Sequence, residues 1–557
     1  MFKMFSEKFY SRRSTVLATH AAVATSNPTA SEIGLSLLKN GANAAEAAVG
    51  IAAVLNLVDP GMTGLGGDCF VLFYDNKQKI VKGINGSGRS PKQLTLDLLS
   101  EKGISIEKGF KKIPRSSAFS VMVPGAAAGW IDCVENFGSG KISLEEIFRP
   151  AIQLAENGFP MHEVTATLYL ENYLHLKTND TSYGSDLLIN GNPPKTGQLV
   201  RNQKFAEVLK DLAKNGKVGF YKGKIAEEIV KTVQGNGGCL TMEDMESHCS
   251  TYDEPIFTDY RGFRVWEMPP NGQGVVALMA LNILEGYSLK NENRMSSSLI
   301  HKLIESTNLA FEQGFKCIFD PSVKPVNLEL LLSKTNAEEK RKSINLEKAS
   351  SKIYCRSGVH AGSDTVYFSV VDNDGNACSF INSIYNVFGS GLVPKNCGFA
   401  LHNRASNFSL RDNHGNCVGP EKRSYHTIIP GMVTHVSNNE LFACFGNTGA
   451  FMQPQGHVQA LSNMIDFGMT PQNALCHPRY CVKYHNIKPH IVYLEEGIPE
   501  KIIEELKGLG HNVVVVSEFS RSMFGRGQII QVRYDEQGNR VLWCGSESRS
   551  DGCALGY

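Results

Sequence analysis

The sequence lacks any long hydrophobic run of the kind that crosses a membrane or directs secretion. The first thirteen residues mix aromatic and charged side chains without a continuous apolar stretch, which argues against a secretory signal. The most apolar run, Ala44 to Val58, is too short to span a bilayer and contains Glu46 and Asn56. We therefore expect a soluble protein without a membrane partner, located in the cytoplasm, while an extracellular location stays open.

Paired cysteines and other metal-binding patterns are also missing. The chain has 14 cysteines, but they are scattered singly, with no C-x-x-C pair and no spacing typical of a zinc site. Such scatter suits buried reduced thiols better than a disulfide framework. The sequence therefore predicts a protein that holds no metal ion and no other cofactor.

Neither sign of charge is in excess. The 56 basic and 55 acidic residues nearly cancel, and a balanced chain gives no reason to expect nucleic acid as a partner. A hydrophobic fraction of 42% is ordinary for a globular enzyme. The length of 557 residues is enough for several domains or one large composite domain.

Helix patterns are clearest near the amino terminus. The run from Ser31 to Leu38 is amphipathic, and Gly41 can end that helix in a left-handed conformation. Asn43, followed three residues later by Glu46, predicts a capping box that opens a second, buried helix. Far downstream, a further helix is expected to begin at Val458.

One long segment has a different composition. Lys, Asn, Glu and Ser dominate between Pro321 and Tyr354, and no strand pattern is sustained there. The composition predicts a mobile, solvent-facing segment over residues 322–364.

The segment that follows predicts a β-hairpin. From Thr365 to Asp372, hydroxyl-bearing and apolar side chains alternate with the period of a half-buried strand. Asn373-Asp374-Gly375 is a turn pattern, and a second β-rich run continues to Tyr385. If Gly375 is the left-handed residue of a three-residue loop, Thr365 and Ser383 lie directly opposite each other.

The hairpin sequence also carries a resemblance to a known family. The run Thr365-Val-Tyr-Phe-Ser-Val-Val-Asp-Asn-Asp-Gly-Asn-Ala resembles the start of the small subunit of γ-glutamyltransferases, also called glutathione hydrolases. Other segments resemble that family in the same order along nearly the whole chain, among them Val123–Trp130 and Gly545–Tyr557. The likeness is weakest over residues 322–360.

The resemblance implies a precursor that cuts itself between Asp364 and Thr365. Residues 1–364 would form a large subunit and residues 365–557 a small subunit that begins at the nucleophile. The implied fold class is α+β, the αββα four-layer sandwich of amino-terminal-nucleophile hydrolases, formed jointly by the two autoprocessed fragments. The partners expected are these two fragments as a heterodimer, with a dimer of heterodimers left open.

Four positions are expected to carry the chemistry. A threonine hydroxyl needs a base, and the α-amine freed by cleavage, with an ordinary pKa of about 7.7–8.0, can serve Thr365 in that role. In the family a second threonine hydrogen-bonds the nucleophile, and its position holds Ser383 here. Two consecutive family glycines whose amides stabilise the oxyanion match Gly449 and Ala450. Alanine keeps the amide N–H that this function needs.

The substrate-binding positions depart from the glutathione-cleaving members. An aspartate that holds the substrate amino group is replaced by Asn407, and a glutamine by Arg404. Paired serines become His426 and Thr427, and an asparagine becomes Tyr385. An anionic partner for an ammonium is lost and a cation is gained. A role for His426 as a general base is one alternative, and a pocket histidine is the other.

Two earlier loops differ as well. The usual carboxylate-binding arginine position holds Ser87, and Arg89, two residues later, is a candidate substitute because a guanidinium binds carboxylates bidentately. A bland exposed loop arginine is the competing interpretation. The segment from Met62 to Phe70 resembles a glycine-rich family segment, with Asp68 where a third glycine is usual. No Gly-Lys-Ser/Thr follows, so a phosphate loop is the weaker interpretation.

Three functions stay open at this point. The first is a self-cleaving hydrolase or transferase of γ-glutamyl amides, with glutathione as the default substrate and water or an amine as acceptor. The second is an amidohydrolase of the same type for another small acidic amide, glutaryl- or oxamate-like. The third is a catalytically weak binding or effector protein, against which intact Thr365, Ser383 and Gly449 argue.

Overall fold

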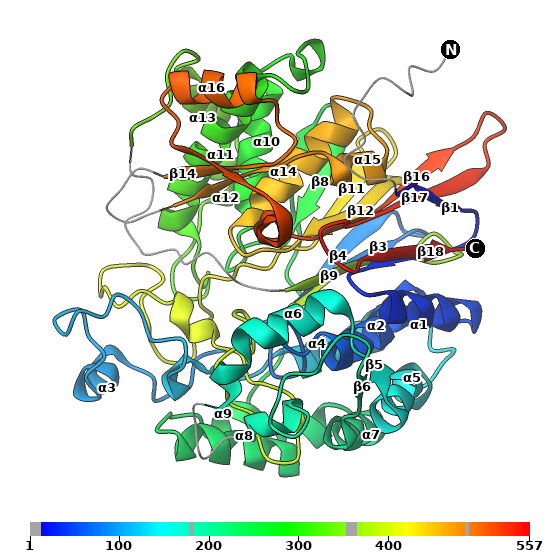
Figure 1. Ribbon diagram of the computed structural model, residues 1–557, viewed down its shortest axis with the longest axis vertical. Helices are drawn as coiled ribbons and strands as arrows, with labels where there is room; N and C mark the ends of the chain where they lie inside the picture. The colour runs from blue at the N-terminus through cyan, green and yellow to red at the C-terminus, as the bar shows by residue number, and fades with distance from the viewer. Residues whose placement is uncertain (1–12, 178–182, 353–364, 485–489) are drawn as a thin grey trace.

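Two antiparallel sheets form the centre of the molecule (Figure 1). The computed structural model describes residues 13–177, 183–352, 365–484 and 490–557. In spatial order the seven-stranded sheet consists of β1 (Val16–Ala18), β17 (Arg540–Ser546), β16 (Gly527–Tyr534), β12 (Leu441–Asn447), β11 (Gly431–His435), β8 (Phe263–Glu267) and β7 (Ile256–Tyr260). The six-stranded sheet consists of β18 (Cys553–Gly556), β2 (Ala22–Thr25), β9 (Val366–Val371), β10 (Ala377–Ser383), β3 (Asp68–Asp75) and β4 (Ile80–Gly86).

Both sheets mix strands from the two sides of Thr365. In the six-stranded sheet, β2, β3 and β4 precede this residue, and β9, β10 and β18 follow it. The seven-stranded sheet likewise joins β1, β7 and β8 to four later strands. The segments before and after Thr365 therefore share one fold, as the resemblance implied.

Helices cover the outer face of each sheet (Figure 1). Against the six-stranded sheet pack α1 (Pro28–Lys39), α2 (Ala44–Val58) and α4 (Ala126–Phe137), with α5 (Leu144–Asn157) and α7 (Gln203–Tyr221) behind them. Against the seven-stranded sheet pack α10 (Gly274–Glu285), α14 (Met452–Ile465) and α15 (Pro471–Cys476), with α11 (Ser297–Cys317) and α16 (Glu500–Gly508) behind.

Three hydrophobic cores separate these layers. One joins α1, α2, α4 and the helices behind them to the six-stranded sheet. A second joins α10, α11, α14 and α15 to the seven-stranded sheet, and a third fills the space between the sheets. The core between the sheets includes Phe70, Tyr367, Ile381 and Met432, all fully buried. The predicted αββα four-layer sandwich is confirmed.

The β9–β10 hairpin has the predicted register. The pairing runs from Val371 opposite Ala377 to Val366 opposite Asn382, so the next pair is Thr365 with Ser383. The loop contains Gly375 at φ +83°, which glycine adopts without a steric penalty. Since alternate strand residues share a face, Thr365 lies on the same side as Tyr367, toward the other sheet.

Strand β12 of the opposite sheet crosses β9 closely. The Ser369 hydroxyl donates to the Cys444 carbonyl oxygen at 3.2 Å, and a Cβ added at Gly446 would lie 2.4 Å from the Tyr367 ring. Moving back along β9 toward Thr365 thus means moving forward along β12. The turn after β12, which contains Gly449 and Ala450, lies at the same end of the sandwich as Thr365.

We expect Gly446→Ala to lower the free energy of unfolding by roughly 1–3 kcal/mol, the usual cost of overpacking a close-packed core. The new methyl group would meet the ring of Tyr367, which is fully buried and cannot move aside. Gly235, the last residue of α8 (Lys224–Gly235), is a matched control because an added Cβ there meets nothing within 4 Å. Urea unfolding of both variants measures the difference; equal stability of the two would contradict the close approach of the sheets.

The helix predictions near the amino terminus are confirmed. Helix α1 spans the predicted amphipathic run, and Gly41 follows it at φ +98°. Asn43 and Glu46 form the predicted capping box of α2. The later prediction is wrong in its start, since α14 begins at Met452 rather than at Val458. Pro454 lies in the first turn of α14, where proline removes no intrahelical hydrogen bond.

The segment from 322 to 352 is more regular than its composition predicted. It contains α12 (Leu328–Leu332) and α13 (Lys334–Lys342). Both dock on α10: the Asn282 amide donates to the Leu332 carbonyl oxygen at 2.9 Å, and Arg341 donates to the Ile283 carbonyl oxygen at 3.2 Å. Apolar packing adds to these bonds, since Ala337 is buried in the core beside α10 and Leu328, Leu331 and Leu332 pack against it. Residues 353–364, including Asp364, lie outside the described part of the chain.

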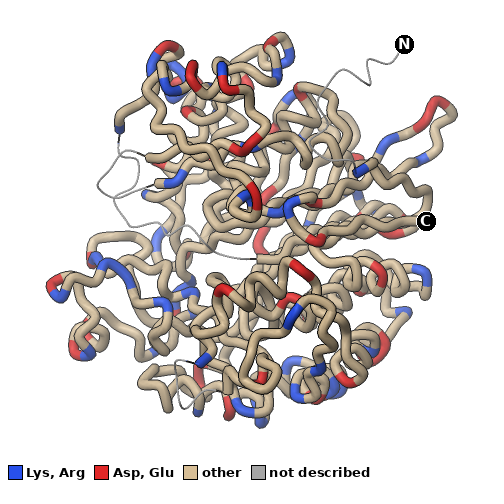
Figure 2. Tube along the Cα trace, in the orientation of Figure 1, with Lys and Arg blue, Asp and Glu red and all other residues tan. Residues whose placement is uncertain are grey.

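Charged residues are spread over the surface. Figure 2 shows lysine and arginine interspersed with aspartate and glutamate on the outer helices and loops, in keeping with the net charge of +1. Every helix in the described residues is too short or too polar to cross a membrane.

Candidate active site

Thr365 and Ser383 form a hydrogen-bonded pair at the end of the hairpin. The Thr365 hydroxyl donates to Ser383 Oγ at 3.1 Å, and the Tyr385 backbone N–H donates to the same oxygen at 2.9 Å. Both side chains are buried. The contact between the two residues is as predicted, and it fixes the direction in which the threonine hydroxyl points.

Asp68 lies directly beside this pair. It is opposite Ser383 in the β3–β10 ladder. One carboxylate oxygen accepts from the Gly88 N–H at 2.9 Å. The other faces His426 Nε2 at 3.0 Å, Arg404 Nε at 3.5 Å and His402 Nδ1 at 3.5 Å. Burial alone would raise the pKa of Asp68, but these neighbours outweigh it and hold the pKa well below its usual range.

His426 is held as a hydrogen-bond donor to Asp68. Its Nδ1 accepts from the Ile428 N–H at 3.3 Å, which leaves the ring proton on Nε2, the atom that faces Asp68. Burial, with the nearby Arg404 charge, lowers the pKa of His426 to about 3. Both ring nitrogens are engaged, so this geometry favours a positioning role over a general base.

Arg404 is a fully buried cation with a free donor. Its Nη1 donates to Thr427 Oγ1 at 2.9 Å, and its guanidinium carbon lies 4.5 Å from the centre of the Tyr385 ring. Nη2 has no hydrogen-bond partner among the described residues, although the side chain is only 1% exposed. A buried unpaired donor is costly, and an anion placed against Nη2 would satisfy it.

The polar atoms of Asn407 are already engaged. Its Oδ1 accepts from the Tyr385 hydroxyl at 2.5 Å, and its Nδ2 donates to the Tyr425 carbonyl oxygen at 3.2 Å. Tyr385 thus contacts three members of the site: Ser383 through its amide, Asn407 through its hydroxyl and Arg404 through its ring. An ammonium group would meet little free negative charge here.

Arg89 lies apart from this cluster. Among the described residues its ion-pair partner is Asp320, at 3.7 Å, which also accepts from the Arg423 N–H at 2.8 Å. Five of the six candidate substrate-binding residues are linked by contacts through Asp68, Tyr385 or Arg404, namely Tyr385, Arg404, Asn407, His426 and Thr427. The sixth, Arg89, has no side-chain contact with these five in the described part of the chain.

The Gly449–Ala450 turn has two unused amides. The residues have φ +100° and +51°, and their carbonyl oxygens accept from the Met452 N–H and the Gln273 side chain, each at 2.8 Å. Within the described residues neither amide N–H donates a hydrogen bond. Adjacent free amides at a left-handed turn are what an oxyanion hole requires. That they face Thr365 Oγ stays a prediction.

A cavity of about 260 Å³ opens at this turn. Its lining is mainly apolar and includes Gly449, Ala450, Met452, Cys481, Met523 and Arg526. The cavity is large enough for a small organic group and adjoins the candidate oxyanion hole.

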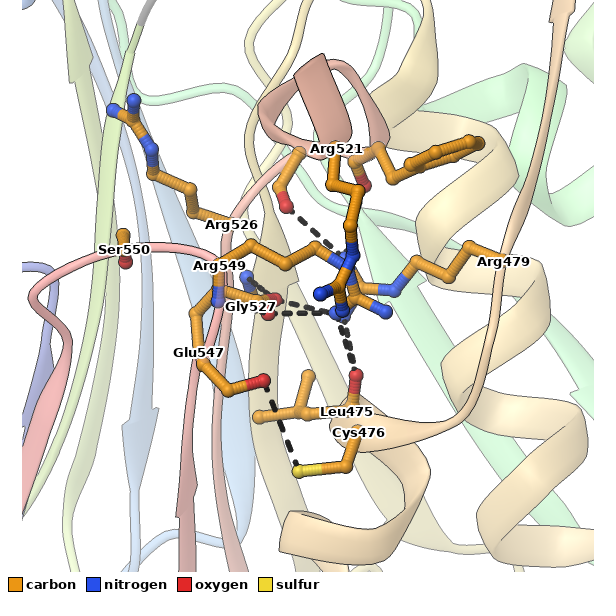
Figure 3. Close-up of polar contacts among 12 residues, drawn as sticks. Leu475, Cys476, Arg479, Arg521, Arg526, Gly527, Glu547, Arg549 and Ser550 are labelled. Atoms are coloured by element: carbon orange, nitrogen blue, oxygen red, sulfur yellow. Dashed lines mark hydrogen bonds and ion pairs between the residues drawn. The ribbon is translucent and has the colours of Figure 1, made fainter. Parts of the chain in front are cut away.

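Figure 3 shows a buried ionic network that includes Arg479, Glu547 and Arg549. Arg479 donates to Phe524 and Gly525 carbonyl oxygens at 2.9 and 3.1 Å and pairs with Glu547 at 2.8 Å. Arg549 pairs with Glu547 at 2.6 Å. Burial would raise the pKa of Glu547, but the two arginines lower it to about 2. The network fixes the 3-10 segment Glu518–Phe524 that contributes Met523 to the cavity.

Sequence reasoning missed two members of the site, Asp68 and His402. Asp68 was visible as a departure from the glycine usual at its position, but the sequence alone did not link it to the other changes. Asp68 pairs with Arg404 and His426. The departures from the family at these three positions therefore belong together, because the negative charge of Asp68 is balanced by Arg404 and hydrogen-bonded by His426. Processing at Asp364 lies outside what the structure describes.

Comparison with known proteins identifies the family of the chain. Residues 30–557 match the profile of the family described as gamma-glutamyltranspeptidase. The chain is 34% identical to the glutathione hydrolase-like YwrD proenzyme of Bacillus subtilis (strain 168), over 97% of this chain and 99% of that protein. It is 28% identical to the oxamate amidohydrolase proenzyme of Klebsiella pneumoniae subsp. pneumoniae, over 98% and 100% of the two chains.

Solved structures show the same likeness. The crystal structure of cephalosporin acylase from Bacillus halodurans superposes with a TM-score of 0.89 at 38% identity, covering 100% of this chain and 99% of that one. The fold, the matched segment and the sequence identity agree along nearly the whole chain. The chain therefore belongs to the gamma-glutamyltranspeptidase family of amino-terminal-nucleophile enzymes.

Proposed function

We propose that this enzyme hydrolyses small amides whose acyl group carries a free carboxylate, through an acyl-enzyme on Thr365. The observation that carries the proposal is the buried Arg404 guanidinium, whose Nη2 has no partner among the described residues. Arg404 lies next to the nucleophile pair, because it stacks on the ring of Tyr385 and the backbone N–H of Tyr385 donates to Ser383 Oγ.

Activation would precede turnover. Thr365 Oγ attacks the Asp364 carbonyl carbon, the C–N bond breaks, and the Thr365 nitrogen takes up a proton to become a free α-amine while Asp364 is held as an ester on Oγ. Water then hydrolyses that ester, which releases the Asp364 carboxylate and restores the Thr365 hydroxyl. That amine then accepts the hydroxyl proton during turnover, which an amide nitrogen cannot do. The two fragments would stay together, since strands from both lie in each sheet.

Turnover would place the two halves of the substrate on different sides of Thr365. The acyl carboxylate binds Arg404, where a charge-assisted hydrogen bond satisfies the free Nη2. The amide oxygen, negative in the tetrahedral intermediate, binds the Gly449 and Ala450 amides. The amine takes a proton and leaves into the adjoining 260 Å³ cavity. Water then hydrolyses the acyl ester and regenerates the Thr365 hydroxyl.

The site favours acyl groups without an α-amino group. An α-ammonium needs an anion or several acceptors, but Asn407 Oδ1 already accepts from Tyr385. Asp68 is neutralised by Arg404 and hydrogen-bonded by His426. Glutaryl amides therefore fit these contacts better than γ-glutamyl amides. The names acylase and amidohydrolase among the relatives are in keeping with this class of reaction.

Glutathione hydrolysis is the second candidate. It is favoured by the 34% identical relative named as glutathione hydrolase-like. In that case a γ-glutamyl acyl group would occupy the Arg404 site, and its ammonium would have to rely on neutral acceptors. A charge-assisted hydrogen bond is about twice as strong as a neutral one, so binding would be weak.

The test compares kcat/KM for glutaryl and γ-glutamyl anilides. We expect kcat/KM of the native enzyme for glutaryl anilide to be at least as high as for γ-glutamyl anilide. Asn407→Asp should shift this ratio about tenfold toward γ-glutamyl anilide, because it adds one charge-assisted hydrogen bond to the ammonium group. Asn413→Asp, exposed in the same loop, is the control and should leave the ratio unchanged. A strong γ-glutamyl preference that Asn407→Asp does not alter would contradict the proposal.

A further inference from the structure

A second cluster of ionisable side chains lies far from the hairpin, among the outer helices. His301 and Glu305 are one turn apart on α11, and His511 follows α16. His301 Nδ1 lies 2.7 Å from His511 Nε2, and the potential ligand atoms of all three residues lie within 4.8 Å of one another. All three side chains are buried. Figure 1 shows α11 and α16 stacked at one edge of the molecule.

The orientation of His301 is fixed by an outer contact. Its Nε2 donates to the Asn345 carbonyl oxygen at 2.8 Å, which leaves a lone pair on Nδ1 directed at the cluster. Histidines that bind metals usually donate their other ring N–H to a carbonyl or carboxylate in this way. His511 Nδ1, by contrast, has no hydrogen-bond partner among the described residues, although this side chain is only 4% exposed.

The charges of the cluster are not balanced by a protein cation. Glu305 is 3% exposed and forms no ion pair with lysine or arginine in the described part of the chain. Burial raises the pKa of Glu305 to about 7 and lowers the pKa of His511 to about 3. Glu305 Oε1 accepts from Asn308 Nδ2 at 3.4 Å. The carboxyl group and the two imidazoles can still present lone pairs to a common centre, and no lysine or arginine among the described residues supplies a positive charge there.

We propose that His301, Glu305 and His511 bind a divalent transition-metal ion of the zinc type. Two imidazoles and one carboxylate are a ligand set that Zn²⁺ and Co²⁺ accept, with the remaining position open to water. The ion supplies the charge that Glu305 lacks and replaces the direct contact between the two histidines. The prediction of a metal-free protein rested on cysteine spacing, whereas this set joins an i, i+4 pair to a histidine 210 residues after His301.

The ion would act as a brace. It would join α11 to the end of α16. The segment at Asn345 is held at the same site by its hydrogen bond to His301. A second bond, from the Ala349 N–H to the Leu509 carbonyl oxygen at 2.7 Å, anchors this stretch to the end of α16. This stretch precedes the segment that leads to Thr365. The site lies outside the catalytic cluster, and its role does not depend on which amide the enzyme cleaves.

The experiment strips the purified full-length protein with a chelator and titrates it with Co²⁺ and then with Zn²⁺. We expect one equivalent of Co²⁺ to bind with visible ligand-field absorption, Zn²⁺ to displace it, and the unfolding temperature to rise with Zn²⁺ but not with Mg²⁺. No stoichiometric binding to the unmodified protein would overturn the proposal. This part of the test requires no variant and so cannot be confused with misfolding.

Variants then locate the site. Glu305→Gln keeps the shape of the side chain but removes its charge. It should weaken Zn²⁺ binding at least about a hundredfold, because changing a residue that merely supports a metal ligand already costs up to about that much and Glu305 would bind the ion directly. Glu312→Gln on the same helix, which is paired with Lys316, is the matched control and should bind as the native protein does. Equal Zn²⁺ affinity in the two variants would place the ion elsewhere and overturn the assignment.

Discussion

Thr365→Ala should be recovered as one uncut chain with amidase activity reduced about 10⁴-fold or more, the order of loss seen when a hydroxyl nucleophile is removed. The variant lacks the oxygen that attacks both the Asp364 carbonyl and the substrate. Its fold should persist, because the loss is limited to one buried methyl group and the 3.1 Å hydrogen bond to Ser383, which is worth about 1 kcal/mol. Denaturing gel electrophoresis and an anilide assay measure the two effects.

Thr365→Ser separates the hydroxyl from the methyl group. Serine keeps an oxygen opposite Ser383, so this variant should still cut, more slowly, and should retain measurable activity. A Thr365→Ala protein that appears as two fragments and remains active would contradict the role of this residue. So would an uncut native protein with full activity, because the α-amine of Thr365 would then still be an amide.

Arg404→Gln should lower kcat/KM for a glutaryl anilide by about 10²–10³-fold, the loss expected when one partner of a buried charge pair is removed. It should change kcat/KM for a neutral valeryl anilide much less, because that acyl group has no carboxylate for the guanidinium. The ratio of the two substrates isolates recognition from general damage. A loss that is equal for both substrates would contradict carboxylate binding at Arg404.

Stability needs a separate control, since Arg404→Gln leaves Asp68 without its cation. Breaking a buried pair in this way typically costs about 3–5 kcal/mol. The double variant Asp68→Asn with Arg404→Gln should recover much of that loss without recovering the preference for glutaryl anilide. Urea unfolding of the two single variants and the double variant forms a mutant cycle that measures the coupling directly.

Local patterns predicted the parts of the fold that depend on neighbouring residues. The Thr365–Ser383 register follows from strand alternation and a single left-handed glycine, Gly375, both visible in the sequence. The capping box of Asn43 and Glu46 has the same local origin. The start of helix α14 was predicted too late because Pro454 and Gly456 indicate a loop. The first turn of a helix, however, tolerates proline.

The candidate site was harder to predict because its contacts join distant segments. Asp68 and His426 are 358 residues apart, and no pattern within either segment predicts that the two side chains are in contact. The resemblance identified the right positions at Tyr385, Arg404 and Asn407, but not which atoms were already engaged. Arg89 appeared as good a carboxylate ligand as Arg404 in the sequence, until its ion pair with Asp320 was seen.

The central claim is that Thr365 forms the acyl-enzyme with an acidic acyl group. The most direct measurement is mass spectrometry of purified enzyme quenched in acid during steady-state turnover of glutaryl anilide, followed by peptide mapping. The account predicts that the small fragment begins at Thr365 and that its first peptide carries one glutaryl group, absent without substrate. A glutaryl adduct on another residue, or a small fragment that begins elsewhere, would contradict it.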